Sequence, residues 1–210
     1  MKHLIIIGAG GMGRTYFDMA RESVGYGEVF DIKGYLDDNT AALDGFKGYP
    51  PMLGKISDYQ VEDGDVFVCS VGGDIRKQLM EMILSRGGKF MTMIHHTARI
   101  GTNVEIGEGT VVGAFTTIGS EAKIGKCNMI QSYVVIGHDS VIGDMNRIDT
   151  HATIVGGVHI ENETNIYTAA VINHGATVES NARVAACSFV IRTVKSGTLV
   201  MGNPAKTMKL

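Results

Sequence analysis

The chain has 210 residues, enough for one large domain or two small ones, and its 44% hydrophobic and 20% charged content is ordinary for a globular protein. Its net charge is −3, with 10 basic and 13 acidic side chains in residues 1–97 and 9 of each in residues 98–210, so neither part has the clustered Lys and Arg of a nucleic-acid-binding surface. No apolar stretch approaches the roughly 20 residues of a membrane span, and we expect a cytoplasmic protein that does not bind membranes.

The first part of the chain alternates strand-like and helix-like segments. Leu4–Gly8 is a continuous apolar run, which is typical of a strand buried in a parallel sheet. Such alternation predicts a small parallel α/β domain of Rossmann type. The other expected elements are a helix over Arg14–Ser23, a strand over Ile32–Leu36, a strand over Val66–Val71, a helix that Asp74 caps and that runs to Ser85, and a last strand over Phe90–Ile94.

Glycines follow the first expected strand, in the order Gly8-Ala9-Gly10-Gly11-Met12-Gly13, and fit the pattern G-x-G-x-x-G. The second expected strand ends in the acidic pair Asp37-Asp38. Bare backbone N–H groups at the start of a helix can receive a phosphate, so the pattern favours a phosphorylated ligand. About 97 residues make only half of a full dinucleotide-binding fold, which argues against NAD. A tight turn with purely structural glycines remains the alternative.

The second part of the chain repeats every six residues. From Ile100 to Val190, all 16 positions reached in steps of six are Ile or Val, and the residue four places further on is always small or β-branched. A strand has period 2 and a helix period 3.6, so neither maintains a period of six. One β-branched side chain per hexad fills the interior of a narrow prism, and the small residue lets the chain turn. The pattern resembles the left-handed parallel β-helix of hexapeptide-repeat acyltransferases, in which three hexads form one coil and the chains assemble as homotrimers.

The two parts together resemble bacterial sugar acetyltransferases that join a truncated nucleotide-sugar-binding domain, here residues 1–97, to a left-handed β-helix, here residues 98–210. The resemblance implies transfer of an acetyl group from acetyl-CoA to an amino group of a nucleotide-linked amino sugar, for bacterial surface glycans. O-acetylation of a sialic acid or another sugar hydroxyl stays open. The segments that carry the resemblance are IIIGAGGMG, GYLDDN, YPPMLG, SVGGDIRKQL, MIHHTARIG, VVIGHDSVIGD and MGNPAK.

The resemblance also implies the roles of individual residues. It makes His138 and Asp139 the catalytic pair, and this suits the chemistry, because acetyl transfer needs a base and a neighbouring carboxylate can orient an imidazole. The chain departs from the family at Met12 and at Arg147, where related enzymes have His; Arg147 can donate hydrogen bonds to a thioester carbonyl or a CoA phosphate. The implied substrate-binding residues are Gly10, Gly11, Met12, Asp37, Asp38 and Gly72, and the implied acetyl-CoA-binding residues are Arg147, Gly156, Thr168 and Ala186.

Two rival functions use the same repeat. A three-histidine zinc enzyme of the γ-carbonic anhydrase type would need a third ligand beside His138 and His174, which share a hexad slot two coils apart, and the sequence offers none at close spacing. We therefore expect no metal. A non-catalytic nucleotide-sugar sensor is the other rival, and the intact His138-Asp139 pair argues against it. His95 matches the junction between the two domains of the family and is expected to be a packing residue.

Overall fold

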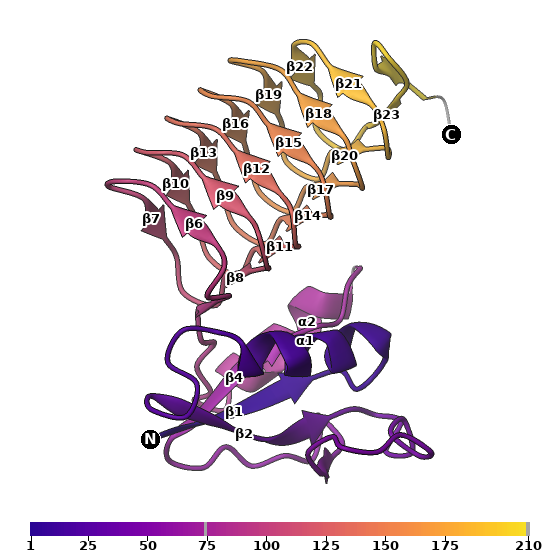
Figure 1. Cartoon of the computed structure of the whole chain (residues 1–210). Helices are drawn as coiled ribbons and strands as arrows, with labels where there is room; N and C mark the ends of the chain where they lie inside the picture. Colours follow the sequence, from indigo (N-terminus) through magenta and orange to yellow (C-terminus); the bar gives the residue numbers. More distant parts are fainter. Residues whose placement is uncertain (74, 209–210) are drawn as a thin grey trace. The chain divides into compact units, whose positions relative to one another are not determined.

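The computed structural model describes residues 1–73 and 75–208 and divides into two compact units, Met1–Met93 and Ile94–Leu210 (Figure 1). The expected domain boundary after residue 97 lies four residues beyond this division. The expected helix cap Asp74 falls outside the described residues. Among the residues that are described, no helix is both long enough and apolar enough to cross a membrane.

The N-terminal unit contains a four-stranded parallel sheet with the strand order β3-β2-β1-β4, which confirms the predicted α/β fold. The short edge strand β3 was not anticipated, because three residues carry too little alternation to indicate a strand. The elements of this unit are β1 (Lys2–Ile7), α1 (Gly11–Arg21), β2 (Phe30–Leu36), β3 (Met52–Gly54), β4 (Asp65–Cys69) and α2 (Ile75–Leu84).

Strand β1 is the centre of this sheet. Its residues from Leu4 to Ile7 are completely buried, as expected for a continuous apolar run with β2 on one side and β4 on the other. Because all four strands are parallel, the loops after β1, β2 and β4 leave the sheet at the same edge. This carboxyl edge is where parallel α/β sheets bind their ligands. The expected strand over Phe90–Ile94 is not one element: Phe90 forms only an isolated bridge to Phe67.

Asp65, at the start of β4, is the centre of a buried polar cluster. Its side chain is fully buried and accepts hydrogen bonds from Lys33 Nζ at 2.8 Å, Tyr59 Oη at 2.7 Å and the Glu62 amide at 2.9 Å. Burial by itself raises the pKa of a carboxyl, but these donors together outweigh it and hold the pKa of Asp65 below its ordinary value. Burial lowers the pKa of Lys33, but its hydrogen bonds to Asp65, the Glu62 carboxylate and Tyr59 outweigh this and raise the pKa.

Replacement of the Asp65 carboxylate tests its contribution to the stability of the fold. We expect Asp65→Asn to destabilise the chain at pH 7 by about 2 kcal/mol, because Lys33 keeps its charge and loses its buried partner. A lowered folded-state pKa contributes stability above the unfolded-state pKa, and this contribution is lost as the pH falls through the folded-state pKa. Urea unfolding should therefore show a gap between wild type and variant at pH 7 that shrinks toward pH 3. A gap that is equal at both pH values would contradict the role of the charge.

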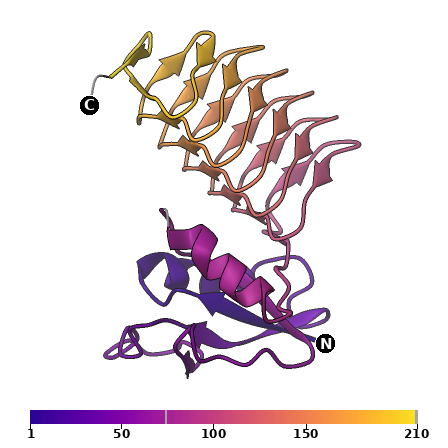
Figure 2. The same ribbon diagram turned by 180° about the vertical axis from the view of Figure 1, so that it is seen from behind.

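The C-terminal unit is a three-sided parallel β-helix, which confirms the predicted hexapeptide-repeat fold; Figure 2 shows its coils from behind. Face 1 consists of β6 (Arg99–Ile100), β9 (Thr117–Ile118), β12 (Val135–Ile136), β15 (Thr153–Ile154), β18 (Val171–Ile172) and β21 (Phe189–Val190). Face 2 consists of β7 (Glu105–Ile106), β10 (Lys123–Ile124), β13 (Val141–Ile142), β16 (His159–Ile160), β19 (Thr177–Val178) and β22 (Thr193–Val194). Face 3 consists of β5 (Met93–Ile94), β8 (Val111–Val112), β11 (Met129–Ile130), β14 (Arg147–Ile148), β17 (Asn165–Ile166), β20 (Arg183–Val184), β23 (Leu199–Met201) and the antiparallel β24 (Lys206–Thr207).

Successive coils stack in register. Val135 pairs with Thr153 and Ile136 with Ile154, so that a residue lies next to the residue 18 places further along the chain; in the last coil the offset is 16, as between Thr177 and Thr193. From Val112 to Val200, the second residue of each strand points into the prism, and these Ile and Val side chains form one continuous buried core, whereas Ile100 in the first coil is 39% exposed. The first residue of each strand points outward. The position of a residue within the 18-residue coil therefore decides whether its side chain lies inside or outside.

Four-residue turns connect the faces at three corners. Corner 1–2 contains residues 137–140, 155–158 and 173–176, and corner 3–1 contains residues 131–134, 149–152, 167–170 and 185–188. The third residue of these turns adopts a left-handed backbone, with φ of 57° at Asp139 and 61° at His151. The fourth residue is small or β-branched and is buried, as the sequence predicted.

Candidate active site

His138 and Asp139 lie next to each other on corner 1–2. His138 Nδ1 is 2.6 Å from Asp139 Oδ2, and the two side chains are 67% and 64% exposed. Because a carboxylate can only accept a hydrogen bond, this contact places the imidazole proton on Nδ1 and leaves the lone pair on Nε2. The pair therefore presents an oriented base on an open corner of the prism.

Gly156 occupies the same corner position one coil beyond His138. A Cβ atom at residue 156 would lie 2.6 Å from Nε2, 2.9 Å from Cε1 and 3.0 Å from Cδ2 of His138, so the imidazole occupies the space that a side chain would fill. The amide N–H of Gly156 donates to no acceptor in the described part of the chain. Beside it, Gly157 is exposed with φ of 68°. The base therefore lies against the backbone of Gly156 and Gly157, which carry no side chains.

His174 borders the same two glycines from the next coil. A Cβ atom at Gly157 would lie 3.4 Å from His174 Cε1. The sequence predicted that His138 and His174 share one side of the prism two coils apart, and both lie on corner 1–2. The imidazoles of His138 and His174 thus border the two glycines from neighbouring coils on opposite sides.

The other implied acetyl-CoA contacts lie elsewhere on the prism. Arg147 points outward from face 3, nine residues and therefore half a coil after His138. Its guanidinium is 35% exposed and is held by Asp149, with Nε at 2.7 Å from Oδ1 and Nη2 at 3.1 Å from Oδ2. Thr168 and Ala186 are exposed on corner 3–1, one coil apart. Within one chain, only Gly156 of these four residues shares a corner with His138.

The contact between Gly156 and the imidazole yields a direct test. Gly156→Ala should displace the His138 ring and lower kcat by at least about 10-fold, because a shift of about 1 Å in a reacting group strongly lowers the reaction rate. Steady-state acetyl transfer measures this effect, and Ser120→Ala, at the same corner position one coil before His138, is the matched control. A Gly156→Ala variant as fast as the control would show that the ring does not need this space.

The glycine loop of the N-terminal unit is shaped by its own backbone contacts. A Cβ atom at Gly13 would lie 1.9 Å from Gly8 O, so the helix can approach the strand only because residue 13 is glycine. Asp37, at the end of β2, accepts hydrogen bonds from the Ala9 amide at 2.7 Å and from the Asn39 amide at 2.8 Å. Asp37 therefore holds the loop after β1 in place, a role that the sequence did not indicate.

The remaining implied substrate residues surround this loop. Gly10 is the N-cap of α1 and has no side-chain cap, so the first N–H groups of the helix have no partner from a capping side chain. Gly10, Gly11 and Asp38 are exposed, while Met12 and Gly72 are half-buried. Gly72 follows β4, the neighbour of β1 in the sheet, and so belongs to the same carboxyl edge.

Arg14 is a further cation at the glycine loop that sequence reasoning treated only as the start of a helix. Its guanidinium lies over the Phe46 ring, 3.9 Å from the centroid, and its Nη1 donates to Ala9 O at 3.4 Å. Its Nη2 is 4.0 Å from the position of a Cβ at Gly11. A basic residue in the first turn opposes the helix dipole, and α1 has no acidic residue there to offset it. That unfavourable placement is the signal in the sequence that could have indicated an anion site.

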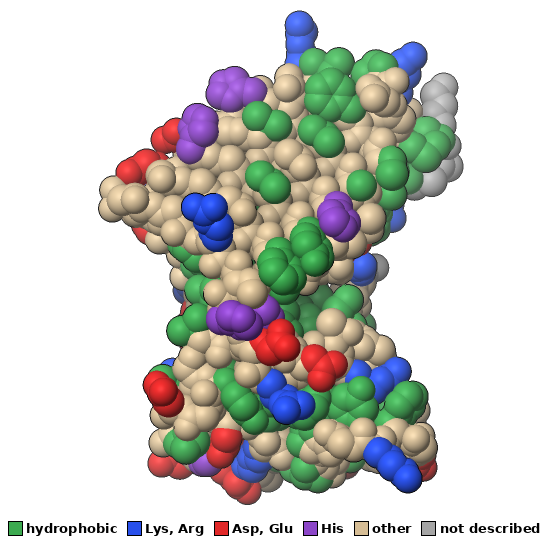
Figure 3. Space-filling model, in the orientation of Figure 1, with side chains coloured by type: hydrophobic (Ala, Val, Ile, Leu, Met, Phe, Trp, Pro, Cys, Tyr) green, Lys and Arg blue, Asp and Glu red, His purple; other side chains and the backbone are tan. Residues whose placement is uncertain are grey.

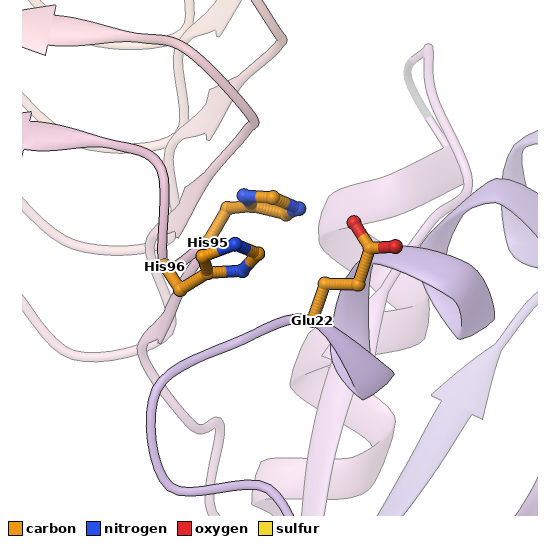
Figure 4. Close-up of side chains that lie close together, drawn as sticks. All are labelled: Glu22, His95 and His96. Atoms are coloured by element: carbon orange, nitrogen blue, oxygen red, sulfur yellow. The ribbon is translucent and has the colours of Figure 1, made fainter.

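His95 is a packing residue, as expected. It is 3% exposed, its Nδ1 lies 2.8 Å from Thr97 Oγ1, and its ring stacks on His96 with centroids 4.7 Å apart (Figure 4).

Comparison with known proteins finds similar sequences. Residues 3–83 match the model of the PglD N-terminal domain. Over 119 residues, 54% of this chain, the sequence is 32% identical to UDP-N-acetylbacillosamine N-acetyltransferase of Bacillus subtilis (strain 168); the match covers 52% of that protein, so the chain spans about half the length of this curated relative.

Solved structures extend the similarity to the whole chain. The acetyltransferase domain of PglB from Neisseria gonorrhoeae FA1090 is 27% identical, with a TM-score of 0.88, over 99% of this chain and 100% of that chain. The same domain in complex with acetyl coenzyme A gives 27% identity and a TM-score of 0.88 over 99% of both chains. WeeI from Acinetobacter baumannii AYE is 27% identical with a TM-score of 0.84, over 99% of this chain and 100% of that chain. Over nearly its whole length the chain is therefore similar in fold to the acetyltransferase domain of PglB, and residues 3–83 match the PglD N-terminal domain.

Proposed function

We propose that this protein transfers the acetyl group of acetyl-CoA to the amino group of a nucleotide-linked amino sugar, in the cytoplasmic synthesis of bacterial surface glycans. The observation that carries the proposal is the His138–Asp139 pair, whose Nε2 lies against the bare backbone of Gly156. The names of the relatives support an amine as nucleophile, since the Bacillus subtilis protein is an N-acetyltransferase and the PglB domain binds acetyl coenzyme A. The alternative of a sugar hydroxyl has no comparable support.

In the proposed reaction His138 acts as the general base and Asp139 orients it. The amine attacks the thioester carbonyl carbon, a C–N bond forms, and His138 Nε2 takes the proton that the nitrogen releases. Asp139 stabilises the imidazolium through Nδ1. We propose that the Gly156 N–H, which has no acceptor in the described chain, donates to the developing oxyanion. When the C–S bond breaks, the imidazolium returns the proton to the CoA thiolate. This chemistry uses no metal ion.

In this proposal the glycine loop binds the nucleotide part of the acceptor. Gly10 and Gly11 expose the amide end of α1 to a diphosphate, and Arg14 adds a positive charge beside them. Asp37 keeps the loop in shape. The exposed Asp38 is left for hydroxyl groups of the ligand, which can donate hydrogen bonds to its carboxylate.

The acetyl-CoA site is proposed to be completed by a second copy of the chain. Corner 1–2 carries His138, whereas Arg147, Thr168 and Ala186 lie on face 3 and corner 3–1. In a closed ring of three prisms with face 1 toward the axis, corner 1–2 of each chain would meet corner 3–1 of the next. All of these contacts would then line one groove.

The surface of face 1 supports this arrangement. Its outward residues are uncharged except for Arg99, and Figure 3 shows this side of the solenoid as largely free of acidic and basic side chains. On corner 3–1, Phe115 and Tyr133 stack at 5.0 Å and are 54% and 49% exposed. A neighbouring prism would remove this apolar surface from water. We therefore propose a homotrimer.

A substrate screen tests the proposed reaction. UDP-, GDP-, dTDP- and CMP-linked sugars are offered with acetyl-CoA, and thiol release is followed. We expect turnover with an amino sugar and at least about 10²-fold lower kcat for His138→Ala, because the general base is lost. Lys123→Ala is the control; Lys123 points outward from β10 on face 2, next to Val141, the first strand residue after His138. Acetylation of hydroxyl groups alone, or near-normal turnover of the His138 variant, would refute the proposal.

Complementation between two impaired variants tests the shared site. His138→Ala and Arg147→Ala chains are co-expressed in equal amounts, and oligomers of all compositions are purified together. If a site takes His138 from one chain and Arg147 from another, about one quarter of the sites in random mixtures regain both residues. Activity near one quarter of wild type is expected, which is clearly above the activity of either variant alone. No recovery would place both residues of a working site in one chain.

A further inference from the structure

A buried carboxylate holds the guanidinium of Arg147. The Asp149 side chain is 7% exposed and accepts three hydrogen bonds: from Arg147 Nε at 2.7 Å, from Arg147 Nη2 at 3.1 Å, and from Gln131 Nε2 at 2.6 Å. Gln131 is the residue one coil earlier at the same corner position. The bidentate contact fixes the plane of the guanidinium as well as its position.

The arrangement is confined to one coil. Arg183 occupies the same outward position of face 3 two coils further on, is exposed, and has no ion-pair partner in the described part of the chain. The solenoid therefore does not need an Arg–Asp pair at this position to fold. Burying a carboxylate is unfavourable unless it is fully hydrogen-bonded, so its presence in this coil alone calls for a local reason. The residues at the position of Asp149 in the other coils are Gly113, Gln131, Tyr167 and Ala185.

The level of Arg147 along the prism indicates what it contacts. It follows His138 by half a coil, and one coil rises by only about 4.8 Å. In a ring of parallel prisms, Arg147 of one copy therefore lies at the height of His138 in the next copy. This is the height of the reacting thioester, whereas the phosphates of CoA are separated from it by the whole pantetheine arm.

We propose that Asp149, held by Gln131, is a positioning residue that orients the Arg147 guanidinium toward the thioester carbonyl oxygen at the active site of a neighbouring copy. This rests on the proposed acetyl transfer. Arg147 donates to the oxygen as negative charge develops on it, and Asp149 prevents the long side chain from rotating away. Such a donor acts on the transition state more than on the bound thioester, so the effect belongs in kcat rather than in KM.

The kinetic test uses Asp149→Asn, which keeps the size and the contact to Gln131 but loses the charge-assisted grip on Arg147. We expect kcat to fall about 10-fold, with KM for acetyl-CoA changed by less than about two-fold. In an Arg147→Ala background, Asp149→Asn should have no further effect on kcat, because the two residues act as one unit. Arg183→Ala is the matched control. An equal loss from Asp149→Asn in both backgrounds, or a loss confined to thermal stability, would overturn the proposal.

A measurement without substrate separates this inference from the proposed reaction. In the wild-type oligomer, the Nε–H signal of Arg147 in ¹⁵N NMR should exchange slowly with water, and in Asp149→Asn it should exchange fast while the Arg183 signal stays unchanged. Slow exchange that persists in the variant shows that Asp149 does not hold Arg147, and overturns the inference for any substrate. Absence of acetyl transfer in wild type would instead count against the proposed reaction.

Discussion

The in-register stacking of 18-residue coils is the constraint on which the C-terminal unit depends. Every hexad places one Ile or Val inside the prism, and these side chains meet their equivalents one coil before and after. Each buried aliphatic side chain contributes about 2 kcal/mol relative to exposure, and a shift by one residue would turn the whole set outward. The stacking is therefore cooperative, and the faces and corners repeat from coil to coil as far as β21.

This constraint explains the geometry of the candidate site. The left-handed turn at Asp139 places its carboxylate beside His138, and the stacking brings Gly156 against the imidazole. The same regularity keeps Arg147 on the far side of the prism from His138, since half a coil separates them. A rigid solenoid cannot fold back to join the two. The proposed shared site between copies would use both, and Asp149 gives the half-buried Arg147 a fixed direction.

Much of this could be predicted from the sequence, for identifiable reasons. A period of six that persists over 16 positions leaves one fold, and the position of His138 on a corner follows from counting. The contact with Gly156 could also have been found, because 156 is 138 plus 18 and glycine there removes the side chain that would occupy the imidazole's space. Counting in coils of 18 residues also puts Thr168 and Ala186 on a different corner from His138, although the resemblance assigned all of them to one groove. The grip of Asp149 on Arg147 depends on side-chain rotamers and on Gln131, which no periodicity reveals. In the N-terminal unit, the contact of Asp37 with Ala9 joins two loops 28 residues apart, and such a pairing requires the sheet order to be known.

The compactness of the reacting region within the repeat has a consequence for how such proteins can diverge. Gln131, His138, Arg147, Asp149 and Gly156 all fall within about one and a half coils. Duplication or loss of a complete coil outside this stretch would leave every one of these neighbours in place. A single-residue insertion inside it would shift the following residues by one position, so that residues of the faces would move toward the corners. Length variation in whole-coil steps is thus compatible with unchanged chemistry. The number of coils is free to follow the dimensions of the acyl carrier or the stability of the assembly.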